Sequence, residues 1–244
     1  MRLLAAFTLF LAAGCASADG VAPKIETARF TEDLDIYPHR IMGEIREKAI
    51  LEAKDDAGRV YRVDLRDSGP GHNVFEDIEP RVVDADGDGR PDIVVVESSQ
   101  TEGGQLAIYS LRNNALVKSA ATPHIGTRFR WLAPVAIADL DGNGKVDLAY
   151  IDRPHLAKTL RVWSWAPGGL TEVAQLGGVT NHRIGEDFIS GGLRECGDGP
   201  EMIVAEANWS GTVAVTFDAP TLTRRSLRYP ATPSGFAQAL SCAD

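Results

Sequence analysis

The stretch VVDADGDGRPDIVVV, residues 82–96, decides the fold of this protein because it joins a dense acidic loop directly to an apolar strand. The acidic residues are Asp84, Asp86, Asp88 and Asp92. Carboxylates this close together repel one another, so a chain that keeps them together most simply gathers them around a cation. The run after Asp92 is rich in β-branched residues and predicts a buried strand.

The acidic loop recurs at a constant interval of 55 residues. ADLDGNGKVDLAYID, residues 138–152, repeats it in intact form. The residues that match the four aspartates are Asp139, Asp141, Asn143 and Asp147. Another 55 residues lead to LRECGDGPEMIVAE, residues 193–206, where Arg194 and Cys196 replace the first two aspartates. We therefore expect no metal in this third copy.

Each repeat consists of short β-rich segments separated by turn residues, and no part of the chain after the N-terminal apolar stretch has a long helical period. A shorter fourth copy without an acidic loop is visible at residues 37–65. Short antiparallel strands at this spacing predict an all-β protein, a small β-propeller of about four four-stranded blades with calcium-binding hairpin loops. The segment KIETARF, residues 24–30, could close the ring as the last outer strand.

The two intact loops resemble the FG-GAP or VCBS-type repeat, the calcium-binding blade unit of integrin-like propellers. The shared pattern is D-x-[DN]-x-[DN]-G-x-x-D followed by a strand, and the resemblance extends over about residues 75 to 218. It implies two calcium sites. The first would use Asp84, Asp86, Asp88, the carbonyl of Arg90, and Asp92. The second would use Asp139, Asp141, Asn143, the carbonyl of Lys145, and Asp147.

The chemistry of the loops agrees with this implication, because calcium prefers oxygen ligands at such alternating positions. Gly89 and Gly144 stand at the sixth position, where a sharp turn needs positive φ. Neither loop is an EF-hand, since Val95 and Tyr150 occupy the twelfth position in place of glutamate. The alternative is a pair of Asp-Gly turns that bind no metal.

The N-terminus reads as an export signal, residues 1–18, followed by a single domain over residues 19–244. Arg2 precedes an apolar stretch that is too short for a mature membrane span. LAAGC resembles a bacterial lipobox that would make Cys15 the lipid-modified first residue, whereas ASA at residues 16–18 resembles an ordinary cleavage site. We expect an exported protein, either a periplasmic or outer-membrane lipoprotein or a freely secreted one, which meets a membrane only through this anchor.

Export leaves Cys196 and Cys242 in a compartment that permits disulfides, and we expect them to pair. The chain is acidic, with a net charge of −9, and has no basic cluster. This argues against a nucleic-acid partner. A further set of carboxylates recurs at the ends of the second strands and forms either an acidic ring or repeat scaffolding: Glu52, Glu97, Asp152 and Glu206.

The loops between repeats should lie on one face of the disc, where propellers bind ligands. The candidates there are His72, Arg128, Arg130, His182 and Arg183. The alternative is that they pack and hydrogen-bond within the repeats. The four tryptophans are expected to fill gaps between blades: Trp131, Trp163, Trp165 and Trp209.

Two classes of function fit the sequence. The first is a non-enzymatic binding or scaffolding module of the cell envelope or surface, with a protein or carbohydrate ligand that the sequence does not identify. It is favoured because no G-x-S-x-G, H-E-x-x-H or Walker motif occurs. The second is a hydrolase or lyase acting on sugars or phosphates, which predicts that His72 or His182 titrates beside a carboxylate such as Asp77 or Asp187.

Overall fold

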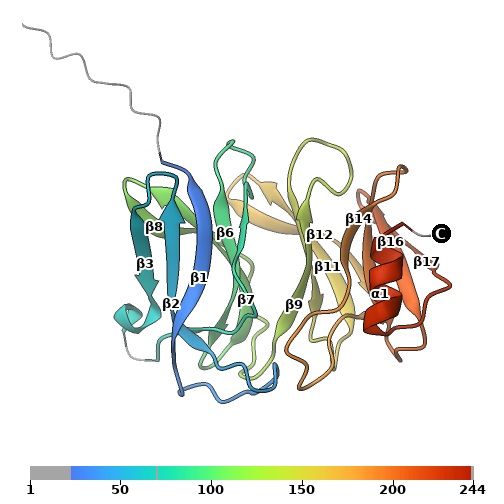
Figure 1. The fold of residues 1–244 in the computed structure, drawn as a ribbon, viewed down its shortest axis with the longest axis horizontal. Helices are drawn as coiled ribbons and strands as arrows, with labels where there is room; N and C mark the ends of the chain where they lie inside the picture. Colours follow the sequence, from blue (N-terminus) through green and yellow to red (C-terminus); the bar gives the residue numbers. More distant parts are fainter. Residues whose placement is uncertain (1–22, 70, 243–244) are drawn as a thin grey trace, which may run out of the picture.

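The structure is a computed structural model that describes residues 23–69 and 71–242. The predicted signal peptide, residues 1–18, and the predicted lipidation site at Cys15 lie outside the described residues. Four antiparallel β-sheet units, which we call blades 1 to 4, follow one another along the chain in a curved row (Figure 1). Within the described ranges, no helix is both long and apolar enough to cross a bilayer.

The blades have the following strands. Blade 1 contains β1 (Ile25–Asp33), β2 (Lys48–Asp55) and β3 (Val60–Asp64). Blade 2 contains β5 (Arg81–Val83), β6 (Asp92–Ser99), β7 (Gly103–Arg112) and β8 (Ala115–Ala121). Blade 3 contains β9 (Leu132–Ala138), β10 (Asp147–Asp152), β11 (Thr159–Ala166) and β12 (Gly169–Gly177). Blade 4 contains β14 (Gly192–Glu195), β15 (Pro200–Glu206), β16 (Thr212–Asp218) and β17 (Thr221–Ser226).

Four smaller elements complete the fold. They are η1 (Leu65–Ser68), β4 (Val74–Phe75), β13 (Val179–Thr180) and α1 (Pro233–Leu240). β4 pairs with both β2 and β6, so blades 1 and 2 share one continuous sheet. β13 pairs with the end of β15 in blade 4. The predicted all-β, propeller-like architecture is confirmed, although blade 1 has three strands where the repeat predicts four.

The hydrophobic core consists of three apolar layers, one between each pair of neighbouring blades. Leu51 of β2 packs toward Ile93 and Val95 of β6 in the first layer. The second layer joins β6, β7, β9 and β10, and the third joins blade 3 to blade 4. This explains why strands such as β6 and β10 are buried on both faces and read as continuous apolar runs. Trp131, Trp163 and Trp165 all pack in the second layer, as predicted, whereas Trp209 packs against Phe236 of α1.

The two ends of the row are finished differently. The outer face of blade 1 is charged, since Glu52 accepts hydrogen bonds from Arg29 (2.9 Å) and Arg62 (2.8 Å) on the flanking strands. The outer face of blade 4 is covered by α1, whose Phe236 and Ala239 pack with the apolar side chains of β15 and β16. Polar or covered terminal faces are how repeat arrays end without a partner.

The row does not close into a ring through the N-terminal segment. Instead of completing blade 4, β1 pairs along its length with β2 (Phe30 opposite Leu51), and blades 1 and 4 lie at opposite ends of the molecule (Figure 1). The suggested closing role of residues 24–30 is therefore wrong. The alternation of Ile25, Ala28 and Phe30 toward the layer shared with blade 2 accounts for this pairing.

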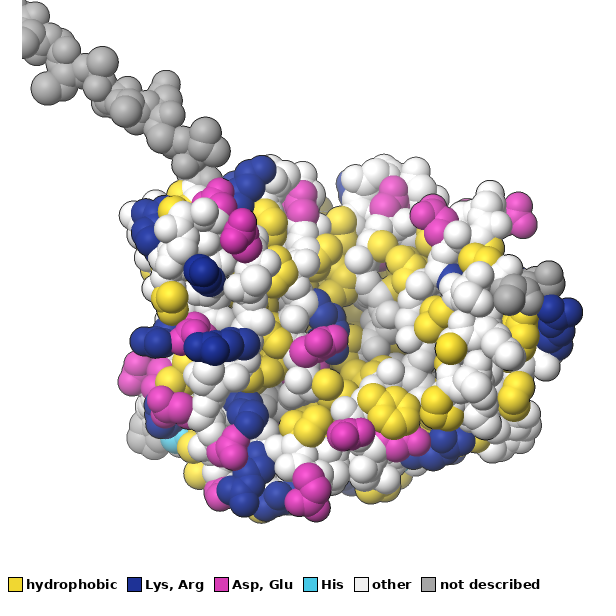
Figure 2. Space-filling view, in the orientation of Figure 1, with side chains coloured by type: hydrophobic (Ala, Val, Ile, Leu, Met, Phe, Trp, Pro, Cys, Tyr) yellow, Lys and Arg dark blue, Asp and Glu magenta, His cyan; other side chains and the backbone are white. Residues whose placement is uncertain are grey.

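An open apolar hollow results on the face shown in Figure 2, where hydrophobic side chains gather between the innermost strands. It is lined by Val83 of β5, Val135 and Ile137 of β9, and Leu193 of β14. On the side of the inter-blade loops, the β1–β2 connection bridges the row, because the Gly185 amide donates to the Ile41 carbonyl at 2.9 Å. This bridge brings residues near 40 and 185 together.

Candidate functional site

The first acidic loop, residues 84–92, is a compact turn whose carboxylates converge. Carboxylate oxygens of Asp84, Asp86 and Asp88 lie within 4.8 Å of one another. The turn is held by backbone amides: Gly89 donates to Asp84 (2.9 Å) and Arg90 to Asp88 (2.8 Å). Gly89 has φ of +83°, which confirms the positive φ expected at the sixth position.

The second loop, residues 139–147, repeats this geometry. Oxygens of Asp139, Asp141 and Asp147 lie within 4.8 Å of one another. The Gly144 amide donates to Asp139 at 2.8 Å, as Gly89 does to Asp84 in the first loop. Asn143 accepts from the Lys145 amide at 2.8 Å. The two loops, 55 residues apart, thus each bring three carboxylates together. The ninth-position aspartate joins the cluster in the second loop, whereas Asp92 is not among the converging residues of the first.

Each loop is anchored to the core by its second residue. Ala85 and Leu140 are both buried, and each amide donates at 3.2 Å to the ninth-position aspartate, Asp92 or Asp147. Trp165 of blade 3 also donates through Nε1 to the Ala85 carbonyl. The acidic side chains therefore sit on a rigid base that the blade interfaces provide.

The ninth-position carboxylates of the two loops lie in surroundings that disfavour their charged form, and a bound cation would offset this. Burial raises the pKa of Asp92, and the neighbouring charges of Asp86 and Asp88 raise it further. Burial likewise raises the pKa of Asp147, with Asp141 and Asp139 adding to the effect.

One buried oxygen atom of the first loop would also be stabilised by a bound cation. Oδ1 of Asp84 is buried and has no hydrogen-bond partner among the described residues. A buried acceptor without a partner is costly, and a bound divalent ion would satisfy it. The residues present therefore fit calcium.

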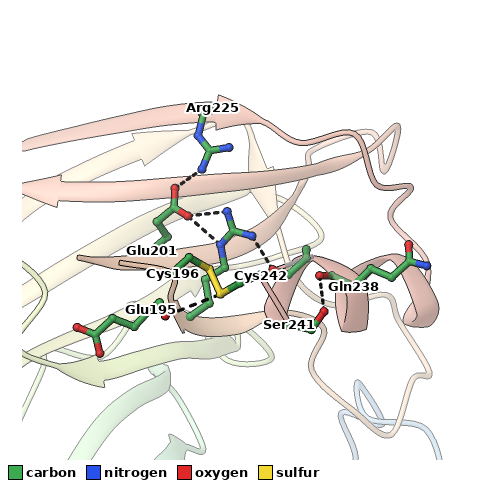
Figure 3. Close-up of a disulfide and its surroundings, with 9 residues drawn as sticks. Glu195, Cys196, Glu201, Arg225, Gln238, Ser241 and Cys242 are labelled. Atoms are coloured by element: carbon green, nitrogen blue, oxygen red, sulfur yellow. Dashed lines mark hydrogen bonds and ion pairs between the residues drawn. A yellow bond between two sulfur atoms is a disulfide. The ribbon is translucent and has the colours of Figure 1, made fainter. Parts of the chain in front are cut away.

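In the third copy of the loop, other residues replace the first two aspartates and link the loop to neighbouring elements. Figure 3 shows the disulfide, which is one of these links. Arg194 stands where the first aspartate would be, pairs with Glu201 at 2.6 Å, and donates to the Ala239 carbonyl of α1 at 2.6 Å. Cys196 stands at the third position and forms the predicted disulfide with Cys242. The loop that lacks the metal pattern thus fastens the C-terminal helix to blade 4.

The predicted His and Arg face is only partly assembled. Arg130 lines a pocket between the loops. His182 packs against Trp131, which lines the same pocket. Arg183 lies over the Trp209 ring at 3.6 Å and pairs with Glu186, while Arg128 stacks on Phe129. His72 lies apart from the others, beside the Gly69 carbonyl (3.3 Å) in blade 1.

Neither His72 nor His182 hydrogen-bonds a carboxylate among the described residues, although Asp64 lies near His72 and Glu186 near His182. His182 is fully buried and bonds the Glu186 carbonyl (2.9 Å) and His155 (3.2 Å). Asp77 pairs with Arg81 at 2.8 Å and accepts from the Val96 amide. The His182 side chain is therefore held in the packed interior by a backbone carbonyl and a second imidazole.

The recurrent carboxylates form cross-strand ion pairs and not an acidic ring. Glu97 pairs with Lys118 at 2.7 Å, and Asp152 pairs with Arg161 at 3.0 Å. In blades 1 and 4 the corresponding cations are Arg62 and Arg224. Each blade thus repeats one acid–base pair within its sheet, between neighbouring strands in blades 1 and 3 and across the intervening strand in blades 2 and 4. This is a structural role.

One polar pair was missed by sequence reasoning. Nδ1 of His39 lies 2.5 Å from Oε1 of Glu76, which is fully buried and also accepts from Ser98. Burial raises the pKa of Glu76. His39 belongs to the β1–β2 connection, which has no counterpart in the other repeats, so neither spacing nor motif could have identified it.

The half-buried His155 and the buried His182 should make stability depend on pH. Burial, with help from the charges of His182, His39 and Lys158, lowers the pKa of His155 from 6.5 to about 4, and burial also lowers that of His182. Between pH 6.5 and about 4, these histidines therefore bind protons in the unfolded chain but not in the folded chain. Their contribution to stability is fully present above pH 6.5 and is lost as the pH falls through this window.

Melting temperatures of the wild type and His155→Gln across this pH range would test the prediction. The carboxylates titrate in both proteins, so their contribution cancels in the comparison. The variant should lose less stability on acidification, and parallel profiles would contradict the prediction.

Comparison with known families agrees with the loop geometry. The family model of the FG-GAP-like repeat matches residues 84–150. The match begins at the first aspartate of one loop and ends in β10, just after the last aspartate of the next. A comparison with curated proteins found no match. The part of this protein that carries both acidic clusters, residues 84–150, is therefore similar to the FG-GAP-like repeat.

Proposed function

We propose that this protein is an exported, calcium-stabilised module that binds or scaffolds other molecules in the cell envelope and is not an enzyme. The observation that carries the calcium assignment is the buried, unpartnered Oδ1 of Asp84 inside a cluster of three carboxylates. Arg90 and Lys145 would add backbone carbonyls, as the resemblance to FG-GAP repeats implies. Calcium would supply charge neutralisation and rigidity, because each ion offsets repulsion within a turn.

The proposal of export draws on the disulfide between Cys196 and Cys242, since such bonds persist in oxidising compartments. The binding role draws on the repeat architecture, which presents loops of several blades on one side. The absence of a hydrogen bond from His72 or His182 to a carboxylate among the described residues favours binding over acid–base catalysis. An N-terminal lipid anchor at Cys15 and free secretion both remain compatible with this role.

Calorimetric titration of the mature protein with calcium tests the proposal, and we expect two sites. Thermal unfolding in calcium and in chelator should differ strongly, since each site adds about 2.7 kcal/mol at a free ion concentration one hundred times Kd. Magnesium is the control, because its smaller octahedral shell suits these loops poorly. Absence of both a binding heat and a thermal shift would refute calcium stabilisation.

A further inference from the structure

Segments from distant parts of the chain meet around a pocket of about 240 Å³ on the side of the inter-blade loops. We call it the loop pocket, and its lining includes His39, Arg130, Trp131, His155, Leu156 and Ile184. Backbone hydrogen bonds join these segments: Gly185 donates to Ile41 at 2.9 Å, and Arg153 to Trp131 at 3.0 Å. The walls are therefore fixed to one another.

The polar wall is built on buried groups. His39 is held by the fully buried Glu76 at 2.5 Å, and Trp131 donates through Nε1 to the Glu76 carbonyl at 2.8 Å. On the opposite side, His155 is held by the fully buried His182 at 3.2 Å. Buried groups thus fix the orientation of both imidazoles of the pocket, which is the arrangement of a preorganised site.

The lining of the loop pocket contains basic side chains, although the protein as a whole is acidic. None of its lining residues is acidic within the described parts of the chain, although the net charge of the protein is −9. Arg153 is balanced by Asp152 at 2.8 Å. Arg130 donates to the Phe129 carbonyl at 2.8 Å and makes no ion pair among the described residues. Its guanidinium is thus available to an external anion.

The rest of the pocket is apolar. The Trp131 ring contributes to its wall, and the rim carries Leu156 and Ile184, which are 64% and 69% exposed. Exposed large apolar side chains beside a cavity are typical of a ligand site. The volume is below the usual range of about 300–1,000 Å³ for drug-sized ligands, so the pocket suits a small molecule.

Strained backbone supports the same location. Phe129 and Arg153 both line the pocket and adopt φ of +57° and +44°. Non-glycine residues in this region cost free energy, and such positions cluster at ligand sites.

We propose that the loop pocket binds a small organic acid with an aromatic or branched aliphatic body, whose carboxylate pairs with Arg130. The apolar body contacts Trp131, Leu156 and Ile184. This deepens the proposed binding function by naming the site and ligand class, and it is independent of calcium binding.

Calorimetric titration with phenylacetate, benzoate and isovalerate tests the proposal, with phenylacetamide and benzamide as neutral matches. We expect saturable binding of at least one acid and at least about tenfold weaker binding of its amide. The side-chain NMR signals of His39 and His155 should shift with the acid. Equal affinity for acid and amide, or no saturable binding of any acid, would overturn the proposal.

Variants localise the site. Arg130→Gln should weaken acid binding by about tenfold, and Leu156→Ser should weaken it without disturbing the fold because the side chain is exposed. Arg29→Gln, which removes the same charge from the outer face of blade 1, should leave affinity unchanged. Unaltered affinity in a folded Arg130→Gln protein would sink the proposal. The calcium response of the same protein separates this failure from failure of the proposed function.

Discussion

Replacing Asp84 with alanine is expected to lower the calcium stoichiometry from two ions to one. It should also remove about 2.7 kcal/mol of calcium-dependent stability when the free ion is at one hundred times Kd. Asp84 is central because one oxygen accepts from the Gly89 amide while the other is buried without a partner. Calorimetry and denaturant unfolding, each with and without calcium, measure the two quantities.

The third loop offers a matched control for this variant. Asp198 is exposed and lies at the fifth position of the copy in which Arg194 and Cys196 replace the first two aspartates. Asp198→Ala should leave stoichiometry and calcium-dependent stability unchanged. If Asp84 served only as a turn residue, Asp84→Ala would lower stability equally in calcium and in chelator, and that result would count against the metal site.

Replacing Arg194 with methionine is expected to lower the free energy of unfolding by about 3 kcal/mol. The Arg194 side chain is 1% exposed and joins Glu201 to the Ala239 carbonyl. Its loss leaves a buried carboxylate with a single partner and a buried carbonyl without this donor, and both are costly. Urea denaturation of the oxidised protein measures the effect without disturbing the disulfide.

Arg225 provides the comparison, because it pairs with the same Glu201 but is 54% exposed. Arg225→Met should cost no more than about 1 kcal/mol, as expected for an exposed ion pair. Similar losses in the two variants would show that burial does not govern this network. A larger loss in Arg194→Met is the expected order.

Much of the architecture could be predicted because it depends on sequence patterns within short segments of the chain. The acidic loops, their 55-residue spacing and the strands that follow them lie in short continuous segments, and backbone geometry enforces them locally. Gly89 takes positive φ because the turn requires it, whatever the rest of the chain does. The pairing of Cys196 with Cys242 was predictable because these are the only two cysteines beyond the predicted export signal.

Several sites could not be predicted because they depend on which distant segments meet. His39 and Glu76 are 37 residues apart and contact each other only because the β1–β2 connection crosses the loop side of the row. The loop pocket needs residues near 40, 130, 155 and 184 at once. His72, one of the predicted face residues, is left out because it follows η1 and lines a separate pocket together with Asp64 and Glu97.

The sequence by itself determined the repeat, the β class, the two oxygen-rich loops and the disulfide. The tertiary structure alone decided that β1 belongs to blade 1, that α1 covers blade 4, and that Arg130 faces a pocket with oriented histidines. The physical reason is the distance along the chain over which each kind of interaction acts. Turn and strand preferences act over a few residues, whereas the partners of a buried polar group or an outer blade face are set by packing between segments far apart in the chain.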